Sequence, residues 1–376
     1  MLFKSLAISA LAAGALAQDL TTLLANTTEL SNLTTYLGLF PDLVGQLSSS
    51  QNITLLAPNN EAFSRFLNSS AGAALAQNDT DLIQGLFTYH VLEGAYPNFT
   101  DVQFIPTLLQ PPQFTNVTGG QVVQAVPGDN STAFFSGLLN NASSTGAPLN
   151  YSGGVIHIID EVLIIPQNVS ETAIQANLTA VAGALTSADL VETVDYLTDV
   201  TVFAPNNAAF EAIGSALPNL TTEDLTSILQ YHVIQGTVGY SNQLQNGSLM
   251  TVQGNNVTIA VVDGEVFVNS ARVVVADVLV ANGVVHVIDN VLNPNNATAT
   301  ADPSQETGAP AFSGASSASS VPFTSNVPTP TASAATESAP GATGASSSSS
   351  AAAMPMKTGA VGAAALFGGA ALVMNM

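Results

Sequence analysis

Hydrophobic and polar positions along this chain follow the periods of strands and of helices, and the same change from a short apolar run to a helical spacing occurs twice. Short apolar runs within residues 54–63 and 201–210 both stop at the sequence Ala-Pro-Asn-Asn. Proline ends a strand because it has no N–H to donate, and asparagine caps a helix because its side chain accepts a free N–H. Each segment therefore predicts a short buried strand that leads directly into a helix.

A helical spacing of apolar residues follows, and each time it leads to a Tyr-His pair. Leu82, Leu86 and His90 fall on one face of a predicted helix, and a similar spacing precedes His232. The pairs Tyr89-His90 and Tyr231-His232 therefore lie where a helix ends and the chain turns towards a strand.

The second half of the chain then changes to the alternating pattern of strands. Three runs, at 250–253, 256–262 and 265–269, are separated by Gly-Asn and Asp-Gly, which favour tight turns. A last run at 283–292 is apolar on both faces, which is typical of a central strand. The pattern as a whole predicts an α+β fold with a twisted sheet and helices packed on it.

The matching segments reveal a tandem repeat. Residues 54–63 match 201–210 at an offset of 147, and residues 154–163 match 283–292 at an offset of 129. The two Tyr-His pairs lie between these blocks and are 142 residues apart. Because three blocks recur in the same order, we expect two domains, of which the second has shorter connections. The expected domains span residues 18–166 and 167–294.

All four histidines fall within the repeated blocks, so their role bears on function. A catalytic histidine needs an activated nucleophile or a metal, but the chain has no cysteine and no G-x-S-x-G or H-E-x-x-H motif. Asp160 and Asp289 each follow a strand histidine, His157 or His286, by three residues and point to the opposite face. We interpret the histidines as interior residues whose ring nitrogens bond backbone groups. Surface recognition by Tyr-His is the alternative, and no catalytic residue, metal site or cofactor is expected.

The composition excludes several classes of partner. Four basic residues stand against 26 acidic ones, a formal net charge of -22, so the clustered cations that bind nucleic acid or anionic lipid are missing. The absence of cysteine excludes disulfides and zinc–thiolate sites. Repulsion among the carboxylates predicts that stability at pH ~4–5 at least equals stability at pH ~8.

The first 17 residues have the pattern of a secretory signal peptide, in which Lys4 precedes an apolar run that ends at small residues. Sixteen Asn-x-Ser/Thr sequons support secretion, since each is a glycan acceptor in that pathway. Asn52 and Asn256 lie in or beside predicted strands and are set aside. The predicted N-glycosylation sites are Asn26, Asn32, Asn68, Asn78, Asn98, Asn116, Asn130, Asn141, Asn150, Asn168, Asn177, Asn219, Asn246 and Asn296.

The C-terminal part has a different composition. Residues 295–353 are mostly Ser, Thr, Ala, Pro and Gly without periodic apolar positions, which predicts a disordered, O-glycosylated stalk. Residues 354–376 end in an apolar run shorter than the ~20 residues of a membrane-spanning helix. Small residues, a polar spacer and this apolar end together predict a glycosylphosphatidylinositol (GPI) anchor signal, which is removed when the anchor is attached at Ser350.

The repeated blocks resemble the fasciclin domain. Residues 201–210 are similar to the first motif of that family and residues 271–289 to its second, with the Tyr-His pair between them. The first copy keeps the Ala-Pro-Asn-Asn, Tyr-His and Gly-Val-Ile-His segments and departs from the pattern at 140–154. The resemblance covers about three quarters of the chain. It implies two tandem fasciclin-like domains, each a twisted sheet or wedge with packed helices.

The resemblance also implies which residues to examine. Members of the family are mostly adhesion or matrix proteins, and the Tyr-His region is implicated in cell adhesion in some of them. The candidate adhesion residues are therefore Tyr89, His90, Tyr231 and His232. The residues of the shared structural motifs are Pro58, Asn59, His157, Asp160, Pro205, Asn206, His286 and Asp289.

Two such copies followed by a GPI signal resemble fungal cell-surface fasciclin proteins. The leading expectation is a non-enzymatic glycoprotein of the outer leaflet or cell wall, which mediates adhesion or organises the wall or matrix. Its expected partners are surface or wall glycoproteins and glycans. A carbohydrate- or small-ligand-binding wall module is the alternative, although a chain without Trp has few stacking platforms. A secreted hydrolase is disfavoured by the missing nucleophile motif. The partner's identity, the oligomeric state and residence in a vacuole stay open.

Overall fold

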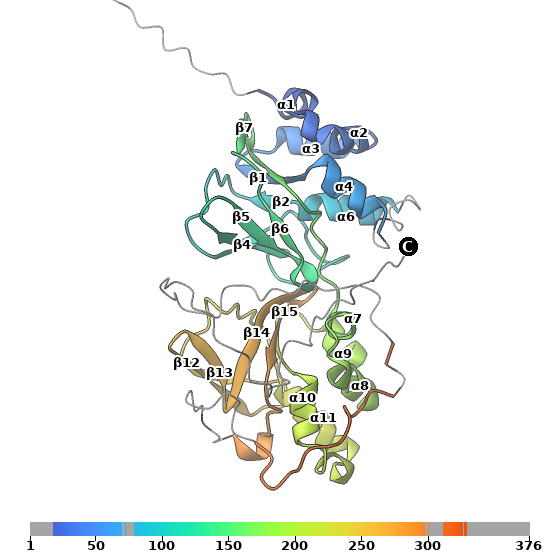
Figure 1. Ribbon diagram of the computed structural model, residues 1–376, viewed down its shortest axis with the longest axis vertical. Coiled ribbons are helices and arrows are strands. Elements are labelled where there is room, and N and C mark those ends of the chain that lie inside the picture. The colour runs from blue at the N-terminus through green and yellow to red at the C-terminus, as the bar shows by residue number, and fades with distance from the viewer. Residues whose placement is uncertain are drawn as a thin grey trace, which may run out of the picture.

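The computed structural model of the protein describes residues 18–69, 72, 79–297, 300, 311–325 and 327–328. Helices and strands follow one another in the same order twice along these residues, and Figure 1 shows the two copies one above the other. The predicted α+β class and the tandem arrangement are therefore confirmed.

The first copy begins with short helices and continues into strands. Its helices are α1 (Leu20–Asn26), η1 (Thr28–Leu30), α2 (Ser31–Leu37), α3 (Pro41–Ser49), α4 (Asn60–Leu67), α6 (Thr80–Tyr89) and η2 (Gly137–Leu139). Its strands are β1 (Ile53–Pro58), β2 (Val91–Glu93), β3 (Gln103–Pro106), β4 (Val122–Pro127), β5 (Thr132–Phe135), β6 (Asn141–Ser143), β7 (Leu149–Tyr151) and β8 (Gly154–Ile159).

The second copy repeats this order. Its helices are α7 (Val169–Gln175), α8 (Thr179–Ser187), α9 (Val191–Tyr196), α10 (Asn207–Ala212), η3 (Leu217–Asn219), α11 (Thr222–Tyr231) and η4 (Pro294–Asn296). Its strands are β9 (Val200–Pro205), β10 (Val233–Gln235), β11 (Gly247–Met250), β12 (Asn256–Val262), β13 (Glu265–Val268), β14 (Ala271–Val280) and β15 (Gly283–Ile288).

A parallel pair of strands lies at the centre of each copy. In the second copy β9 pairs with β15 over the whole length of both strands, and every residue of both is buried. The prediction of a central strand within 283–292 is confirmed, because β15 lies between β9 and β14. In the first copy β1 pairs with β8 in the same register.

The two copies differ in one long strand. β14 runs for 10 residues and joins both halves of a seven-stranded sheet, β10-β9-β15-β14-β13-β12-β11. Its counterpart in the first copy is divided into β6 and β7, which leaves two four-stranded sheets, β2-β1-β8-β7 and β3-β4-β5-β6. Between them Gly146 has a φ of 75° and Pro148 has no N–H, so the chain leaves the ladder. This break falls where the sequence departs from the fasciclin pattern.

One predicted strand is shifted along the chain. The alternating run at 250–253 predicts a strand there, but β11 ends at Met250. The next residues form a turn, because the backbone N and the Oγ1 of Thr251 both donate to the carbonyl oxygen of Asn255, at 3.0 and 2.7 Å. The turn removes these residues from the β-ladder.

The two copies share a hydrophobic core where they meet. Val126, Phe135 and Leu139 of the first copy belong to the same buried cluster as the helices and central strands of the second. Beside this cluster, the ring of Phe104 stacks on the ring of Tyr240 with 4.1 Å between centroids. Burial of these apolar groups favours a fixed association of the two copies.

Hydrogen bonds also connect the two copies across the same junction. Thr115 Oγ1 donates to the carbonyl oxygen of Ala281 at 2.9 Å, and Gln121 Nε2 donates to that of Val280 at 2.9 Å. At the edge of the junction, the backbone N–H of Thr118 donates to the Asp199 carboxylate at 2.7 Å. These bonds fix the register of the interface, which connects the first copy to the end of β14.

Part of the predicted stalk is packed against the second copy. We call residues 311–325 and 327–328 the strap; it is the orange-red trace that passes beside α8 and α10 in Figure 1. Its Phe323 ring meets Phe210 edge-on at 6.0 Å, and Ala318 N donates to the carbonyl oxygen of Glu211 at 2.8 Å. The predicted disordered stalk, residues 295–353, therefore does not hold for the strap, whereas residues 301–310 and 329–353 lie outside the described residues. Partly buried apolar side chains such as Phe312 and Val321 pack the strap against the second copy, although the segment has no helical periodicity.

Two glycines make room for the strap, and only in the second copy. A Cβ on Gly183 would overlap the carbonyl oxygen of Phe323, and a Cβ on Gly214 would overlap Ala318. The equivalent positions of the first copy hold Thr35 and Leu67. The first equivalence follows because the N–H groups of Asn32 and Ala180 donate to Asn60 Oδ1 and Asn207 Oδ1. The second follows from the offset of 147 between the two Ala-Pro-Asn-Asn segments. The groove under the strap is thus a property of the second copy alone.

Several predictions concern residues that the structure does not describe. The signal peptide (1–17), the GPI signal (354–376), Ser350 and Asn78 all lie outside the described residues. Among the residues that are described, none of the helices has the length and apolar character needed to span a membrane.

Candidate functional site

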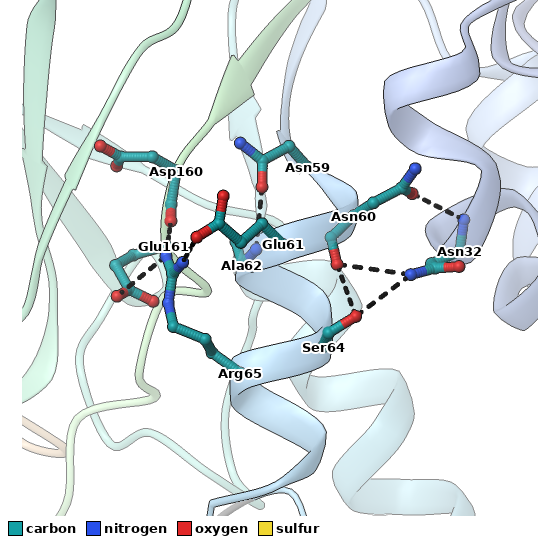
Figure 2. Close-up of polar contacts among 9 residues, drawn as sticks. All are labelled: Asn32, Asn59, Asn60, Glu61, Ala62, Ser64, Arg65, Asp160 and Glu161. Atoms are coloured by element: carbon teal, nitrogen blue, oxygen red, sulfur yellow. Dashed lines mark hydrogen bonds and ion pairs between the residues drawn. The ribbon is translucent and has the colours of Figure 1, made fainter.

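The repeated Ala-Pro-Asn-Asn segments form a strand-to-helix turn, which Figure 2 shows for the first copy. Pro58 ends β1, and Asn59 Oδ1 then accepts from the N–H of Ala62 at 2.8 Å, which caps α4. In the second copy Pro205 ends β9 and Asn206 Oδ1 caps α10 at the same distance. The predicted capping role of these asparagines is confirmed.

The second asparagine of each turn ties it to the N-terminal helices. Asn60 Oδ1 accepts from the N–H of Asn32 at 2.9 Å, and Asn207 Oδ1 accepts from that of Ala180 at 3.0 Å (Figure 2 shows the first pair). Each asparagine also donates back to a carbonyl oxygen, of Thr28 or Asn177. The motif is therefore a structural joint and offers no catalytic group.

The nearby Arg65 lies at the centre of a small ionic cluster on the surface of the first copy. Its guanidinium pairs with Glu61 at 2.9 Å and Glu161 at 3.3 Å, and it also donates to the carbonyl oxygen of Asp160, as Figure 2 shows. The side chain is 45% exposed, so water and salt screen these pairs and they contribute little to stability.

The Tyr-His histidines bond backbone groups through both ring nitrogens. His90 Nδ1 lies 2.8 Å from the carbonyl oxygen of Leu86, and its Nε2 accepts from the N–H of Leu163 at 2.9 Å. His232 repeats this with Ile228 at 2.7 Å and Leu292 at 2.9 Å. Because Nε2 accepts, Nδ1 carries the proton and the ring is neutral. Each ring therefore joins the end of its helix to the segment after β8 or β15.

Burial makes the neutral form the stable one. His90 and His232 are each 3% exposed, and burial lowers the pKa of each ring to about 4. Protonation would place a second donor, Nε2–H, against the N–H of Leu163 or Leu292. Both histidines are thus interior scaffold residues, as interpreted from the sequence.

The tyrosines of the two pairs are also interior. Tyr89 Oη donates to the carbonyl oxygen of Val122 at 3.0 Å, and Tyr231 Oη donates to that of Asn256 at 2.8 Å. Both residues are 0% exposed. Tyr89, His90, Tyr231 and His232 therefore present almost no surface to a partner, which corrects their candidacy as contact residues of an adhesion motif.

The strand histidines lie in central strands, His157 in β8 and His286 in β15. His157 Nε2 donates to the carbonyl oxygen of Tyr96 at 2.7 Å, and His286 Nε2 donates to that of Gly239 at 2.8 Å. Burial lowers the pKa of His157. Asp160 accepts from the N–H of Ser143 at 2.6 Å and Asp289 from that of Arg272 at 2.8 Å. Each carboxylate thus bonds to the backbone of a neighbouring strand and not to its histidine. In the described part of the chain, no cluster of three or more His, Cys, Asp or Glu could bind a metal.

We expect replacement of His232 by Ala to cost about 1–3 kcal/mol of unfolding free energy, because Ile228 O and Leu292 N lose their buried partner. Denaturant unfolding of the full chain measures this, with Gln243→Ala on an exposed turn as the control. Loss of adhesion should follow loss of stability. Adhesion lost with an unchanged unfolding curve would instead make Tyr-His a recognition site.

Comparison with known proteins decides the family. A family model for the fasciclin domain matches residues 25–166 and 176–294, which together contain both copies. The chain belongs to the fasciclin family. The Tyr-His joints and the Ala-Pro-Asn-Asn turns described above are therefore parts of two fasciclin domains.

Fungal relatives match most of this fasciclin chain. A "fasciclin-like arabinogalactan protein" of Arthroderma benhamiae is 39% identical over 308 residues, which cover 81% of this chain and 73% of the relative. The "fasciclin-like arabinogalactan protein CTB11" of Cercospora beticola is 32% identical over 264 residues, 67% of this chain and 70% of the relative. A solved FAS1 domain pair from the insect cell adhesion molecule fasciclin I aligns at a TM-score of 0.35 with 16% identity, covering 70% of this chain and 97% of that one.

The sequons of the two fasciclin domains differ in exposure. Asn116 is half-buried at the junction, and its Nδ2 donates to the carbonyl oxygens of Tyr196 and Leu197. Half-buried side chains also occur at Asn141, Asn168 and Asn296. The exposed predicted sites are Asn26, Asn32, Asn68, Asn98, Asn130, Asn150, Asn177, Asn219 and Asn246. Exposed sites leave room for a glycan, although Asn32 Nδ2 also donates to the carbonyl oxygen of Asn60 at 3.3 Å and Asn68 Nδ2 to that of Ser64 at 2.9 Å. A glycan on Asn116 would compete with the junction.

Proposed function

We propose that this fasciclin chain is a non-enzymatic glycoprotein of the cell surface or cell wall that mediates adhesion or organises the wall or matrix. The main support is the family match over both domains, together with 39% identity to a fungal fasciclin-like arabinogalactan protein. Its partners in this role are glycoproteins or glycans of the surface or wall. A signal peptide at 1–17, N-glycans and a GPI anchor at Ser350 belong to the same proposal.

The geometry of the domains narrows where a partner would bind. The Tyr-His side chains are buried, so contact would involve outward faces of the joined domains and their glycans. The exposed surface carries many carboxylates and few cations, since the described residues include only two basic side chains, Arg65 and Arg272. Such a surface favours neutral or cationic partners over anionic ones.

We expect a phosphatidylinositol-specific phospholipase to release the protein from membranes, because the C-terminal sequence has the order of a GPI signal. The measurement is immunoblotting of the soluble and membrane fractions after treatment, with glucanase digestion to recover copies transferred to the wall. Mass spectrometry that found the C-terminal apolar residues in the mature protein would refute anchoring.

The same treatment tests adhesion. Cells that display the protein should bind beads coated with wall glycans or surface glycoproteins, and enzymatic release should abolish the binding. Purified protein added back should compete with the cells. Adhesion that persists after complete release would contradict the proposal, and turnover of substrates in a parallel hydrolase screen would favour an enzyme instead.

A further inference from the structure

A cleft of about 700 Å³ lies between the two fasciclin domains. Its volume is within the range of ~300–1,000 Å³ typical of small-molecule sites. Both domains contribute, so the cleft exists only when they are joined. The Tyr-His joints do not form its lining surface, except through Leu86 and Leu163, whose backbone groups bond His90.

The two walls of the cleft have opposite character. The wall from the first domain is mainly apolar and includes Phe66, Leu82 and Phe114, with Gln113, Thr115 and Asn116 as its polar members. The wall from the second domain carries the carboxylates of Glu171 and Glu192. A ligand that fills the cleft therefore meets hydrocarbon on one side and negative charge on the other.

An aromatic ring and a third carboxylate extend the acidic wall. Tyr196 lines the cleft and is 77% exposed, one of few large apolar side chains of the described residues left open to water. Asp195 beside it is held in place, because its carboxylate accepts from the N–H and the hydroxyl of Ser170 at 2.9 and 2.6 Å. A ring face next to carboxylates attracts a cation through both its quadrupole and their charge.

The lining also contains unused acceptors. Asn282 is 0% exposed, and its Nδ2 donates to the carbonyl oxygens of Val194 and Leu197 at 2.8 and 2.9 Å, which fixes the amide orientation. Its Oδ1 accepts no hydrogen bond from any described residue, and the same holds for Gln167 Oε1. A buried acceptor without a donor is costly, so each oxygen would gain a hydrogen bond from a donor that reached it.

Positive charge is missing from the described lining, which includes neither lysine nor arginine. The two described arginines are committed elsewhere, Arg65 to Glu61 and Glu161 and Arg272 to Glu265. An anionic ligand would thus meet only repulsion. A neutral sugar is less well matched than a cation, because its hydroxyls also need donors from the protein.

We propose that the inter-domain cleft binds an organic cation, namely a protonated amine or guanidinium carried on an apolar body. The apolar part packs on Phe66, Leu82 and Phe114. The cationic group lies against Tyr196 and the carboxylates of the second domain, where it donates hydrogen bonds. This site is additional to adhesion and does not depend on the anchor or on the identity of the adhesion partner.

The test uses three probes of similar size and different charge. Calorimetric titration of the full-length protein with 4-phenylbutylamine should show binding, whereas the alcohol 4-phenylbutanol should bind about 10-fold more weakly, since a charged hydrogen bond is lost. The acid 4-phenylbutyrate should not bind. Affinity for the amine should fall as salt is added.

Variants locate the site. Glu192→Gln should weaken amine binding about 5-fold, as expected for one partly screened ion pair, and Tyr196→Ala should weaken it as well. Glu223→Gln, an equal change of charge at an exposed position in the first turn of α11, is the matched control and should leave the affinity unchanged. The proposal is overturned if the amine fails to bind, if amine and alcohol bind equally, or if Glu192→Gln and Glu223→Gln behave alike. Binding of a neutral oligosaccharide in place of the amine would also overturn it, while leaving the adhesion proposal intact.

Discussion

Lowering the pH from 7 to 4.5 is expected to cost each fasciclin domain about 2.5 kcal/mol of unfolding free energy. One buried Tyr-His histidine in each domain has its pKa lowered from 6.5 to about 4. In the unfolded chain the ring takes up a proton below pH ~6.5, but in the folded chain it resists protonation until pH ~4. The stabilising contribution is therefore complete above pH ~6.5 and is lost as the pH falls towards 4.

This expectation reverses the one drawn from composition. Repulsion among the carboxylates predicts equal or greater stability in mild acid, but exposed carboxylates are screened by water and salt. His90 and His232 are buried against backbone donors, so their proton linkage is larger. Acid also disfavours folding through His157, whose pKa is lowered by burial.

Denaturant unfolding at several pH values, in low and constant salt, measures the effect. The double variant His90→Gln, His232→Gln should be less stable at pH 7 and should show a flatter dependence on pH. A free energy of unfolding at pH 4.5 equal to or above that at pH 7 would show that the histidines do not dominate the effect of acid on stability.

Replacement of Gly283 by Ala is expected to destabilise the second domain by about 3 kcal/mol or more. Gly283 opens β15 with a φ of 156°, opposite Val200 in the parallel pair. A Cβ at this position would overlap the carbonyl oxygen of Val200, so β9 and β15 would have to separate. A substitution that forces the two central strands of a sheet apart is expected to lower the free energy of unfolding more than most single substitutions do.

The duplication supplies an internal check. Gly154 stands opposite Ile53 in the first domain, and a Cβ there would overlap the Ile53 carbonyl oxygen in the same way. Gly154→Ala should therefore destabilise the first domain by a similar amount. Gly247→Ala is the control, because the nearest atom to its Cβ would be 3.8 Å away. A loss below about 0.5 kcal/mol for Gly283→Ala would be no more than a surface effect and would disprove the argument.

The sequence predicted the interior of each domain better than it predicted how the domains join. The caps at Asn59 and Asn206 follow from local chemistry, because an asparagine side chain reaches an N–H only three residues away. The buried role of His90 and His232 followed from their helical spacing and from the absence of a partner nucleophile. Each of these inferences needs only a short stretch of chain.

Features made by distant residues could not be predicted in the same way. Val126 lies in β4 and Phe135 in β5, and nothing in the sequence around them shows that they pack against the second domain. The cleft combines Phe114 with Glu192, which only the joined domains bring together. The division of one sheet into two depended on Gly146 and Pro148 within a segment that already departed from the family pattern.

The strap determines which part of the protein detaches first when its C-terminal end is pulled. A pull applied beyond residue 328 reaches Phe323 and its contact with Phe210 before it reaches any strand of the sheet. The strap would peel from α8 and α10 one contact at a time, which needs less force than shearing β9 from β15 all at once. Once residues 311–325 are released, these 15 residues span at most roughly 50 Å when fully extended. A single-molecule pulling experiment should record this as an extension at low force, before either domain unfolds. The strap would thus limit the tension that reaches the two folded domains when the C-terminal end is pulled.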